Sequence, residues 1–283
     1  MALCYNVLNY LRGDFFMKKL SHYEKCAVPE LRELICDDVS YTVLSNIVGN
    51  TCDHIFTDGE SIIICHSNPP YPVWIWCNDP KNDNIEMIRK CIKEFFPLEN
   101  YSVIIPYEIL HELKAADSYF EDVRLKMELF SYRLDDIQSI NYPCDGQMAL
   151  AEMADIDALA KIWQDMSREM EGFEFDAETC YGRAKELIDD KAFFVWRNGE
   201  GKIVATASKG KIDKFGKVAA VYTLPEERRR GYAINLVHGV TEAILGEGLV
   251  PTLYTDGGYS ASNECYKKIG YVQVGRLCNA YKD

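Results

Sequence analysis

The chain has 283 residues, 48% of them hydrophobic and 12% aromatic, with a formal net charge of −13. This length suits two domains better than one, and the apolar content is ample for folded cores, which excludes a largely disordered chain. The acidic balance excludes a nucleic acid or an anionic membrane surface as the expected partner, because phosphate groups bind basic surfaces. It permits a cationic amine as substrate, but solubility also explains an acidic surface and is the preferred interpretation.

Cysteine and histidine usage gives no sign of a metal site or a disulfide framework. The eleven cysteines are scattered, odd in number and never spaced as C-x-x-C, which is typical of reduced thiols in a cytosolic protein. His54, His66 and His111 stand singly, without a second ligand at metal-binding spacing. The start of the chain lacks a basic leader, and no apolar run approaches the roughly 18 residues that cross a bilayer. We therefore expect a cytoplasmic protein with no metal and no membrane segment.

The first half of the chain, up to about residue 140, begins with helical patterns and continues with strands. Apolar residues recur at helical spacing in 3–11 and 31–35, whereas residues 39–48 suit a helix or a strand. Asp58-Gly59-Glu60 separates two apolar runs and predicts a hairpin. The expected strands are 54–57, 61–65, 72–77, 101–105 and 124–132, and the expected helices are 85–96 and 107–118.

The second half follows a polar, turn-rich segment, residues 135–146, where we place the junction between two domains. The expected strands are 148–153, 192–196, 202–209, 218–223, 249–255 and 271–276. The expected helices are one that Asp155 caps, 177–189, 233–245, and one that Ser260 or Ser262 caps. Both halves show a meander of strands followed by alternating helix and strand, which suggests an internal duplication.

One stretch of the second half predicts an anion site. Residues 218–223 form an apolar, β-branched strand, Pro225 closes it, and an apolar helical stripe starts at Ala233. The arginine-rich bend of residues 228–233 therefore lies at a helix N-terminus, where backbone amides lack intrahelical partners and the dipole favours anions. Gly231 lets a ligand come close to the main chain, so the pattern predicts a pyrophosphate cradle. Neither the Gly-Lys-Ser/Thr of a P-loop nor the G-x-G-x-x-G of a Rossmann fold is present.

Two motifs then point to a family. The bend has the pattern R/Q-x-x-G-x-G/A, as Arg228-Arg229-Arg230-Gly231-Tyr232-Ala233, between a strand and a helix. Downstream, residues 262–271 (SNECYKKIGY) have the pattern S-N-x-x-Y-x-K-x-G-F/Y. Together they resemble the signatures of the GNAT superfamily, the acyl-CoA-dependent N-acetyltransferases, and the resemblance covers residues 147–281. It implies an α/β (α+β) fold of tandem GNAT-like domains, each with a mixed, mostly antiparallel central sheet flanked by helices.

The resemblance divides the chain into residues 141–283, a GNAT acetyltransferase domain that binds acyl-CoA, and residues 1–140. The latter resemble the degenerate N-terminal domain of two-domain family members, although no motif supports this. Where the arginine-rich bend would stand, the first half has Asp79 and Asp83, whose carboxylates would repel a pyrophosphate. We therefore expect the first domain to hold no cofactor.

The resemblance also implies the site residues. Coenzyme A would place its pyrophosphate on the amides of the bend and its pantetheine arm along the backbone of the preceding strand. The residues assigned to the cofactor are Val221, Tyr222, Thr223, Arg228, Arg229, Arg230, Gly231, Tyr232, Ala233 and Asn263. Tyr266 is the expected general acid for the departing thiolate, and Asn263 lies on the same helical face as the second catalytic residue. An amine of a small molecule or peptide would attack acetyl-CoA directly, without a metal.

Some roles stay open on the sequence alone. The strand 218–223 carries no acidic residue, in contrast to family members that place a glutamate there, so the general base is unassigned. The candidates are Glu171, Glu174, Asp176 and Asp256, and for each of them a plain surface carboxylate is the preferred interpretation. Tyr266 could instead pack in the core, and the arginines could be a solvated charge run. Cys265 has no feature of a nucleophile.

Two other functions fit parts of the pattern. A non-catalytic, acyl-CoA-binding regulatory protein would keep the same fold and cofactor site, but the presence of both Asn263 and Tyr266 counts against it. An aminoacyl-tRNA-dependent transferase can also use tandem GNAT-like domains, but the acidic balance and the phosphate site count against that interpretation.

Overall fold

The computed structural model describes residues 20–24, 29–50, 52–170 and 175–283. The chain forms two compact units, each assembled from segments that are distant in sequence. The first unit comprises Met1–Ser131, Thr255–Tyr259 and Val274–Asp283, and the second comprises Tyr132–Tyr254 and Ser260–Gln273. The helical pattern at 3–11 lies outside the described residues. Separate domains spanning 1–140 and 141–283 stay a prediction.

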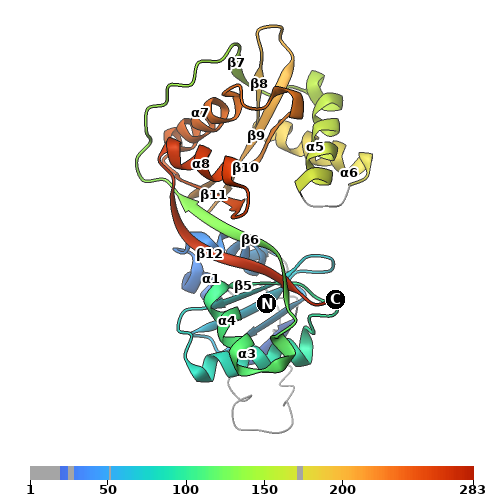
Figure 1. Ribbon diagram of the computed structural model, residues 1–283, viewed down its shortest axis with the longest axis vertical. Helices are drawn as coiled ribbons and strands as arrows, with labels where there is room; N and C mark the ends of the chain where they lie inside the picture. Colours follow the sequence, from blue (N-terminus) through green and yellow to red (C-terminus); the bar gives the residue numbers. More distant parts are fainter. Residues whose placement is uncertain (1–19, 25–28, 51, 171–174) are drawn as a thin grey trace, which may run out of the picture. The chain divides into compact units, whose positions relative to one another are not determined.

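The first unit is a sheet with helices on its faces (Figure 1). Its strands are β1 (Ser21–Glu24), β2 (His54–Thr57), β3 (Ile62–His66), β4 (Val73–Cys77), β5 (Val103–Pro106) and β6 (Arg124–Arg133). Its helices are α1 (Pro29–Ile35), α2 (Thr42–Asn50), α3 (Asn82–Phe95) and α4 (Tyr107–Ala116), with 3₁₀ turns η2 (Val39–Tyr41) and η3 (Ser118–Phe120). Strands β1 to β4 pair antiparallel in sequence order, and β4 pairs parallel with β5.

Local hydrogen bonds explain two of these elements. Asp58 closes the turn between β2 and β3, because its carboxylate accepts the amides of Glu60, Ser61 and Ile62 at 2.8–3.0 Å. The predicted hairpin is therefore confirmed. Residues 39–48, which suit either structure by sequence, are helical, because Asp38 caps their start by accepting the Ser40 amide.

The sheet of the first unit has an apolar core on each face. Alternating residues of β3 and β4 divide between the two cores, as the period of a strand requires. Ile64 and Ile75 pack against α3 and α4 on one face. Trp74 and Trp76 pack against α1 and α2 on the other, so both belong to a core face.

Asp117 couples the stability of the first unit to pH. Its carboxylate accepts hydrogen bonds from Lys93 at 2.8 Å and from Arg89, and it caps η3 by accepting the Tyr119 amide at 2.9 Å. These bonds, first of all the one from Lys93, lower the pKa of Asp117 well below its ordinary value of 3.8. A lowered folded-state pKa stabilises the fold above the unfolded-state value, and this contribution is lost as the pH falls through the folded-state value.

We expect Asp117→Ala to lower the free energy of unfolding at neutral pH by about 1 kcal/mol, the usual cost of losing a capping carboxylate. The loss should shrink as the pH falls below about 4, because the Asp117 carboxylate of the unfolded wild-type chain then binds a proton that the folded chain does not bind. Thermal unfolding midpoints measured along a pH series check this. Asp122→Ala removes the same charge from an exposed residue of the same unit and should change the midpoints little. A pH-independent difference between Asp117→Ala and the wild type would contradict the coupling.

The second unit has the order of elements that the sequence predicts. Its strands are β7 (Gln147–Leu150), β8 (Phe193–Arg197), β9 (Ile203–Ile212), β10 (Phe215–Thr223) and β11 (Val250–Asp256). Its helices are α5 (Ile156–Met170), α6 (Ala177–Asp189), α7 (Tyr232–Gly246) and α8 (Ser260–Ile269), with 3₁₀ turns η4 (Met153–Asp155) and η5 (Pro225–Glu227). Strands β7 to β10 are antiparallel, and β10 is parallel to β11.

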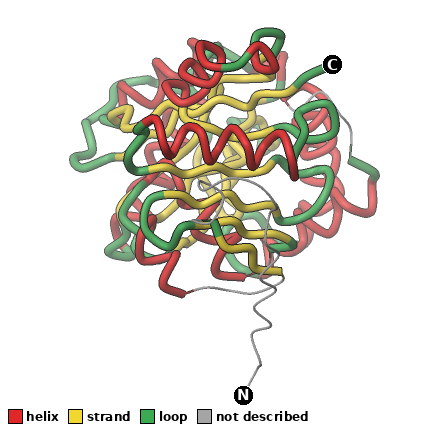
Figure 2. Tube along the Cα trace, turned by 90° about the horizontal axis from the view of Figure 1, so that it is seen from below, coloured by secondary structure: helices red, strands yellow, loops and turns green. Residues whose placement is uncertain are grey.

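Helices cover both faces of this sheet (Figures 1 and 2). Helix α7 packs so closely on β10 that a Cβ at Gly216 would lie 2.2 Å from Ile244. Helices α5 and α6 cover the opposite face, where Leu159 and Ala184 pack with Phe193 of β8. The expected fold class, a mixed and mostly antiparallel sheet flanked by helices, is thus confirmed.

The last strand, β12 (Val272–Tyr281), belongs largely to the first unit. Its residues Leu277–Ala280 pair antiparallel with β5. In both units a helix connects the parallel pair, α3 between β4 and β5 and α7 between β10 and β11. The two units therefore share one order of elements, and the internal duplication stays a hypothesis about its origin.

Candidate functional site

The arginine-rich bend forms the start of α7, where the sequence places it. Arg229 and Gly231 have left-handed backbone angles, with φ of +63° and +86°. Gly231 is the N-cap of α7, and it has no side chain that could accept the amides of the first turn. Asn235 fixes the bend from within the helix: its backbone amide donates to the Gly231 carbonyl at 3.2 Å, and its side-chain amide donates there at 2.9 Å. The amides of the bend are thus held at the helix end for an anion.

The three arginines of the bend differ in their surroundings. Arg228 donates from Nε to the Thr223 carbonyl at 3.1 Å and pairs with Glu169 of α5 at 2.7 Å. Arg230 pairs with Glu227 at 2.9 Å. Arg229 is exposed, and within the described ranges no carboxylate pairs with it. Of the three guanidinium groups, that of Arg229 is the one left to meet an anionic ligand.

Strand β10 has a bulge just before the bend. Its register with β9 shifts between Ala219 and Tyr222, and Ala220 has φ of +48°. A positive φ at a residue other than glycine is strained and occurs often at functional sites. The bulge is held by Thr206 of β9, whose hydroxyl donates to the Ala220 carbonyl at 3.2 Å. Sequence reasoning missed this bulge, because nothing in the run of alanines and valines marks it.

On its other edge, β10 stops pairing with β11 at the same bulge. The pairing with β11 covers Phe215 to Val218, although β10 continues to Thr223. The backbone of residues 219–223 therefore offers an edge to which an extended ligand can add as a strand does. Together with the amides at the start of α7, this edge fits pantetheine and pyrophosphate, the two parts of coenzyme A that the sequence assigns to Val221–Thr223 and to the bend.

Helix α8 carries the two predicted catalytic residues, and both are buried. Asn263 accepts a hydrogen bond from the Tyr132 hydroxyl at 2.9 Å through Oδ1. The ring of Tyr266 is 6% exposed and lies 6.3 Å from the ring of Tyr132 and 6.2 Å from that of Tyr271. Tyr271 is in turn linked to α7 by a 2.8 Å hydrogen bond with Thr241. An aromatic cluster thus fixes α8 beside the helix that begins at the bend.

Two of the candidate general bases have local structural roles. Asp176 caps α6 by accepting the Thr179 amide at 2.7 Å, and Asp256 accepts the Gly258 amide at 2.8 Å. Glu171 and Glu174 lie outside the described residues. A carboxylate that sequence reasoning did not consider, Glu169, accepts the Tyr222 hydroxyl at 3.0 Å. Burial and this carboxylate raise the pKa of Tyr222 to about 12.

The thiol beside Tyr266 is unsuited to nucleophilic attack. Burial raises the pKa of Cys265 to about 11, so the thiolate is scarce at neutral pH. This agrees with the absence of a nucleophile signal in the sequence.

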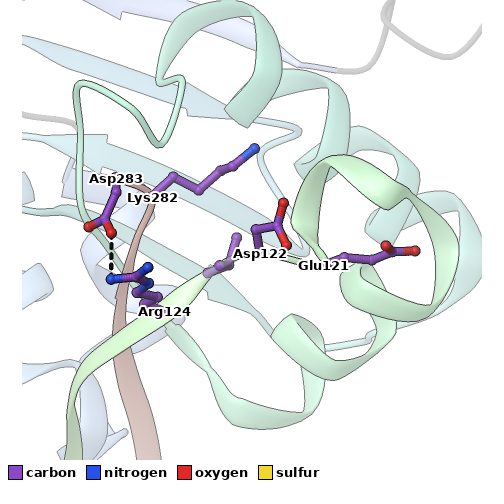
Figure 3. A pocket seen from close by; sticks show the side chains of 6 residues that line it. Glu121, Asp122, Arg124, Lys282 and Asp283 are labelled. Carbon is purple, nitrogen blue, oxygen red and sulfur yellow. Dashed lines mark ion pairs between the residues drawn. The ribbon is translucent and has the colours of Figure 1, made fainter.

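A cavity of about 500 Å³ in the first unit is lined by charged side chains (Figure 3). Its lining consists of Glu121, Asp122, Val123, Arg124, Lys282 and Asp283. Arg124 and Asp283 form an ion pair across it. Ligand pockets are mostly apolar with a few polar groups, and none of the predicted site residues belongs to this lining.

Comparison with known proteins bears on the fold and on residues 200–278. Residues 200–278 match the family model described as FR47-like protein. The fold is similar to a GCN5-related N-acetyltransferase from Sphaerobacter thermophilus, with 14% identity, coverage of 93% of this chain and 95% of that one, and a TM-score of 0.65. It is also similar to a GNAT-family acetyltransferase from Colwellia psychrerythraea, with 12% identity, coverage of 81% and 85%, and a TM-score of 0.56. The match of residues 200–278 to this family model and the likeness of the fold to these acetyltransferases agree with the resemblance to the GNAT superfamily. No curated protein matches its sequence.

The backbone edge of β10 and the amides at the start of α7 would fit the pantetheine and pyrophosphate of coenzyme A. Within the ranges that the structure describes, no cluster of histidine, cysteine, aspartate or glutamate could hold a metal ion. In the same ranges, none of the helices has the length and apolar character needed to cross a membrane. Sequence reasoning missed Asn235, Thr206 and Glu169, because each acts through a contact with the bend or the bulge that only the folded chain brings together.

Proposed function

We propose that this protein transfers an acetyl group from acetyl-CoA to a primary amine by direct attack. The observation that supports this most is the order of three features along β10 and the bend that follows it. The bulge at Ala220 lies in mid-strand, a free backbone edge follows it, and the amides of α7 close the series. This order matches the order of thioester, pantetheine and pyrophosphate in acyl-CoA.

Each part of the chain has a task in this mechanism. The amides from Arg229 to Ala233 hold the pyrophosphate, and the backbone of Val221 and Thr223 holds the pantetheine arm. The bulge turns the backbone near Val221 so that an amide can polarise the thioester carbonyl. Tyr266 donates its hydroxyl proton to the departing thiolate, and Asn263 positions the groups around it. The thioester of acetyl-CoA supplies the activated acyl group when bound.

The proton of the attacking amine needs an acceptor. The amine must be neutral to attack, and the part of β10 that follows the bulge carries no carboxylate. Glu169 of α5 contacts the first residue of the bend, but its carboxylate is already paired with Arg228 and accepts a hydrogen bond from the Tyr222 hydroxyl. We therefore assign the acceptor to water and keep Glu169 as a positioning residue for the bend.

Activity and binding measurements on the full chain test this proposal. Acetyl-CoA is incubated with a panel of amines, and release of free thiol is followed, while calorimetry measures the binding of coenzyme A. We expect micromolar binding and amine-dependent thiol release. Binding without turnover on every amine would favour the non-catalytic regulatory protein, and absence of binding would overturn the cofactor assignment.

A further inference from the structure

Lys217 lies on β10 at the face of the sheet opposite α7. Its neighbour in sequence, Gly216, points to α7 and contacts Ile244, and successive residues of a strand point to opposite faces. In the register of the sheet Lys217 pairs with Gly210 of β9 and with Thr252 of β11. Paired residues of neighbouring strands share a face, so these positions surround Lys217 on the same side.

Lys217 is half-buried, and its ammonium has no carboxylate partner among the described residues. The chain has 44 acidic residues, yet no carboxylate of a described residue pairs with Lys217. The one contact described for its ammonium is with the ring of Tyr254, whose centroid lies 5.2 Å away. Burial lowers the pKa of Lys217. A half-buried cation without a counter-charge is stabilised when an anion joins it.

A second unsatisfied group lies beside it. Thr252 is 1% exposed, and its hydroxyl has no hydrogen-bond partner among the described residues. A buried hydroxyl without a partner is rare in folded proteins and calls for an explanation. At Gly210, on the other side of Lys217, an added Cβ would meet no atom within 4 Å. In the register of the sheet Lys217 is therefore flanked by a residue with an orphan hydroxyl on one strand and by an exposed glycine on the other.

The position of Lys217 on β10 suits a contact with the acceptor substrate. Lys217 precedes Ala219, the first residue of the bulge, by two positions, or about 7 Å of strand. The pyrophosphate cradle lies beyond the other end of the bulge, so Lys217 stands where the acceptor would extend. Given the proposed function, we infer that Lys217 and Thr252 bind the carboxylate of an acceptor that carries both an amine and a carboxylate. The ammonium pairs with the carboxylate, and the Thr252 hydroxyl donates to one of its oxygens.

Binding of amino acids to the full chain tests the inference without any turnover. The probes are β-alanine and γ-aminobutyrate, each compared with its carboxamide, in calorimetric titrations. We expect the wild type to bind at least one carboxylate at least about tenfold more tightly than its carboxamide, the size of a charge-assisted contact. Lys217→Met should abolish this preference, Thr252→Val should reduce it, and Lys217→Arg should retain part of it. Lys217→Met replaces the ammonium by an apolar group of similar length, so we expect it to fold.

Lys211→Met is the matched control, because Lys211 is an exposed lysine of β9 that pairs with Gly216 and thus lies on the opposite face. It should leave the preference unchanged. If neither carboxylate binds better than its carboxamide, or if Lys217→Met keeps the preference, the inference is wrong.

Turnover separates this inference from the proposed function. In thiol-release assays Lys217→Met should raise KM for the preferred carboxylate by at least about tenfold, while rates with the carboxamide stay within about twofold. A loss of turnover with all amines alike would point to Lys217 as a proton acceptor and overturn its role in carboxylate binding. If the preference in binding depends on Lys217 but the wild type acetylates nothing, the proposed function fails and the carboxylate site stands.

Discussion

Gly231→Asp is expected to weaken binding of coenzyme A by at least about 100-fold, or roughly 2.7 kcal/mol. Gly231 is the N-cap of α7 with φ of +86°. A carboxylate at this position would accept hydrogen bonds from the amides that are assigned to the pyrophosphate and would repel its negative charge. Calorimetric titration with coenzyme A measures the effect, and thiol release from acetyl-CoA should fall in parallel.

Gly201→Asp provides a control for the backbone strain that the same substitution causes. Gly201 lies in the turn between β8 and β9 with φ of +81°, and a Cβ there meets no atom within 4 Å. Both variants place a β-carbon at a left-handed position and add one negative charge to the second unit. Gly201→Asp should therefore lose some stability but bind coenzyme A as the wild type does. Equal affinities of Gly231→Asp and the wild type would move the pyrophosphate away from the start of α7.

The fold could be predicted to a large extent because its signals are local. The turn at Asp58, the stop at Pro225 and the glycine at the start of α7 each fix a boundary through bonds within a few residues. Residues 39–48 were ambiguous because their apolar residues suit both periods, and a single capping bond from Asp38 decided for the helix. Local signals could not predict the pairing of distant strands. The pairing of β12 with β5, for example, joins residues that are separated by more than half of the chain.

In the candidate site, too, local features could be predicted from the sequence and features that depend on distant contacts could not. The bend and its position before α7 follow from the sequence 218–233, because a strand, a proline and a helical stripe define it. The bulge at Ala220 does not, since its left-handed backbone is imposed by the pairing with β9 and held by Thr206. Lys217 is likewise one lysine among 31 basic residues in sequence. It becomes notable only through its half-buried place without a described carboxylate partner and through the orphan hydroxyl of Thr252.

Tyr266 tests whether the site does chemistry or only binds a cofactor. The hydroxyl group of a tyrosine can protonate a thiolate leaving group, and a positioned general acid contributes typically 10²–10⁴-fold to a rate. Its burial fits both a dry donor and a simple packing role, since Tyr132 and Tyr271 lie on either side of its ring. Removing the hydroxyl while keeping the ring separates the two roles, because the packing contacts of the ring remain.

We expect Tyr266→Phe to lower kcat by about 100-fold or more and to change the affinity for acetyl-CoA by less than about twofold. Tyr271→Phe is the matched control, because it removes one hydroxyl from the same aromatic cluster and breaks the hydrogen bond with Thr241. That variant should unfold at a lower temperature, by the loss of about 1 kcal/mol, but should keep its kcat. Single-turnover measurements at saturating acetyl-CoA distinguish the chemical step from product release. If the two variants lose stability alike and both keep kcat, Tyr266 is a packing residue, and the proton of the thiolate must come from water.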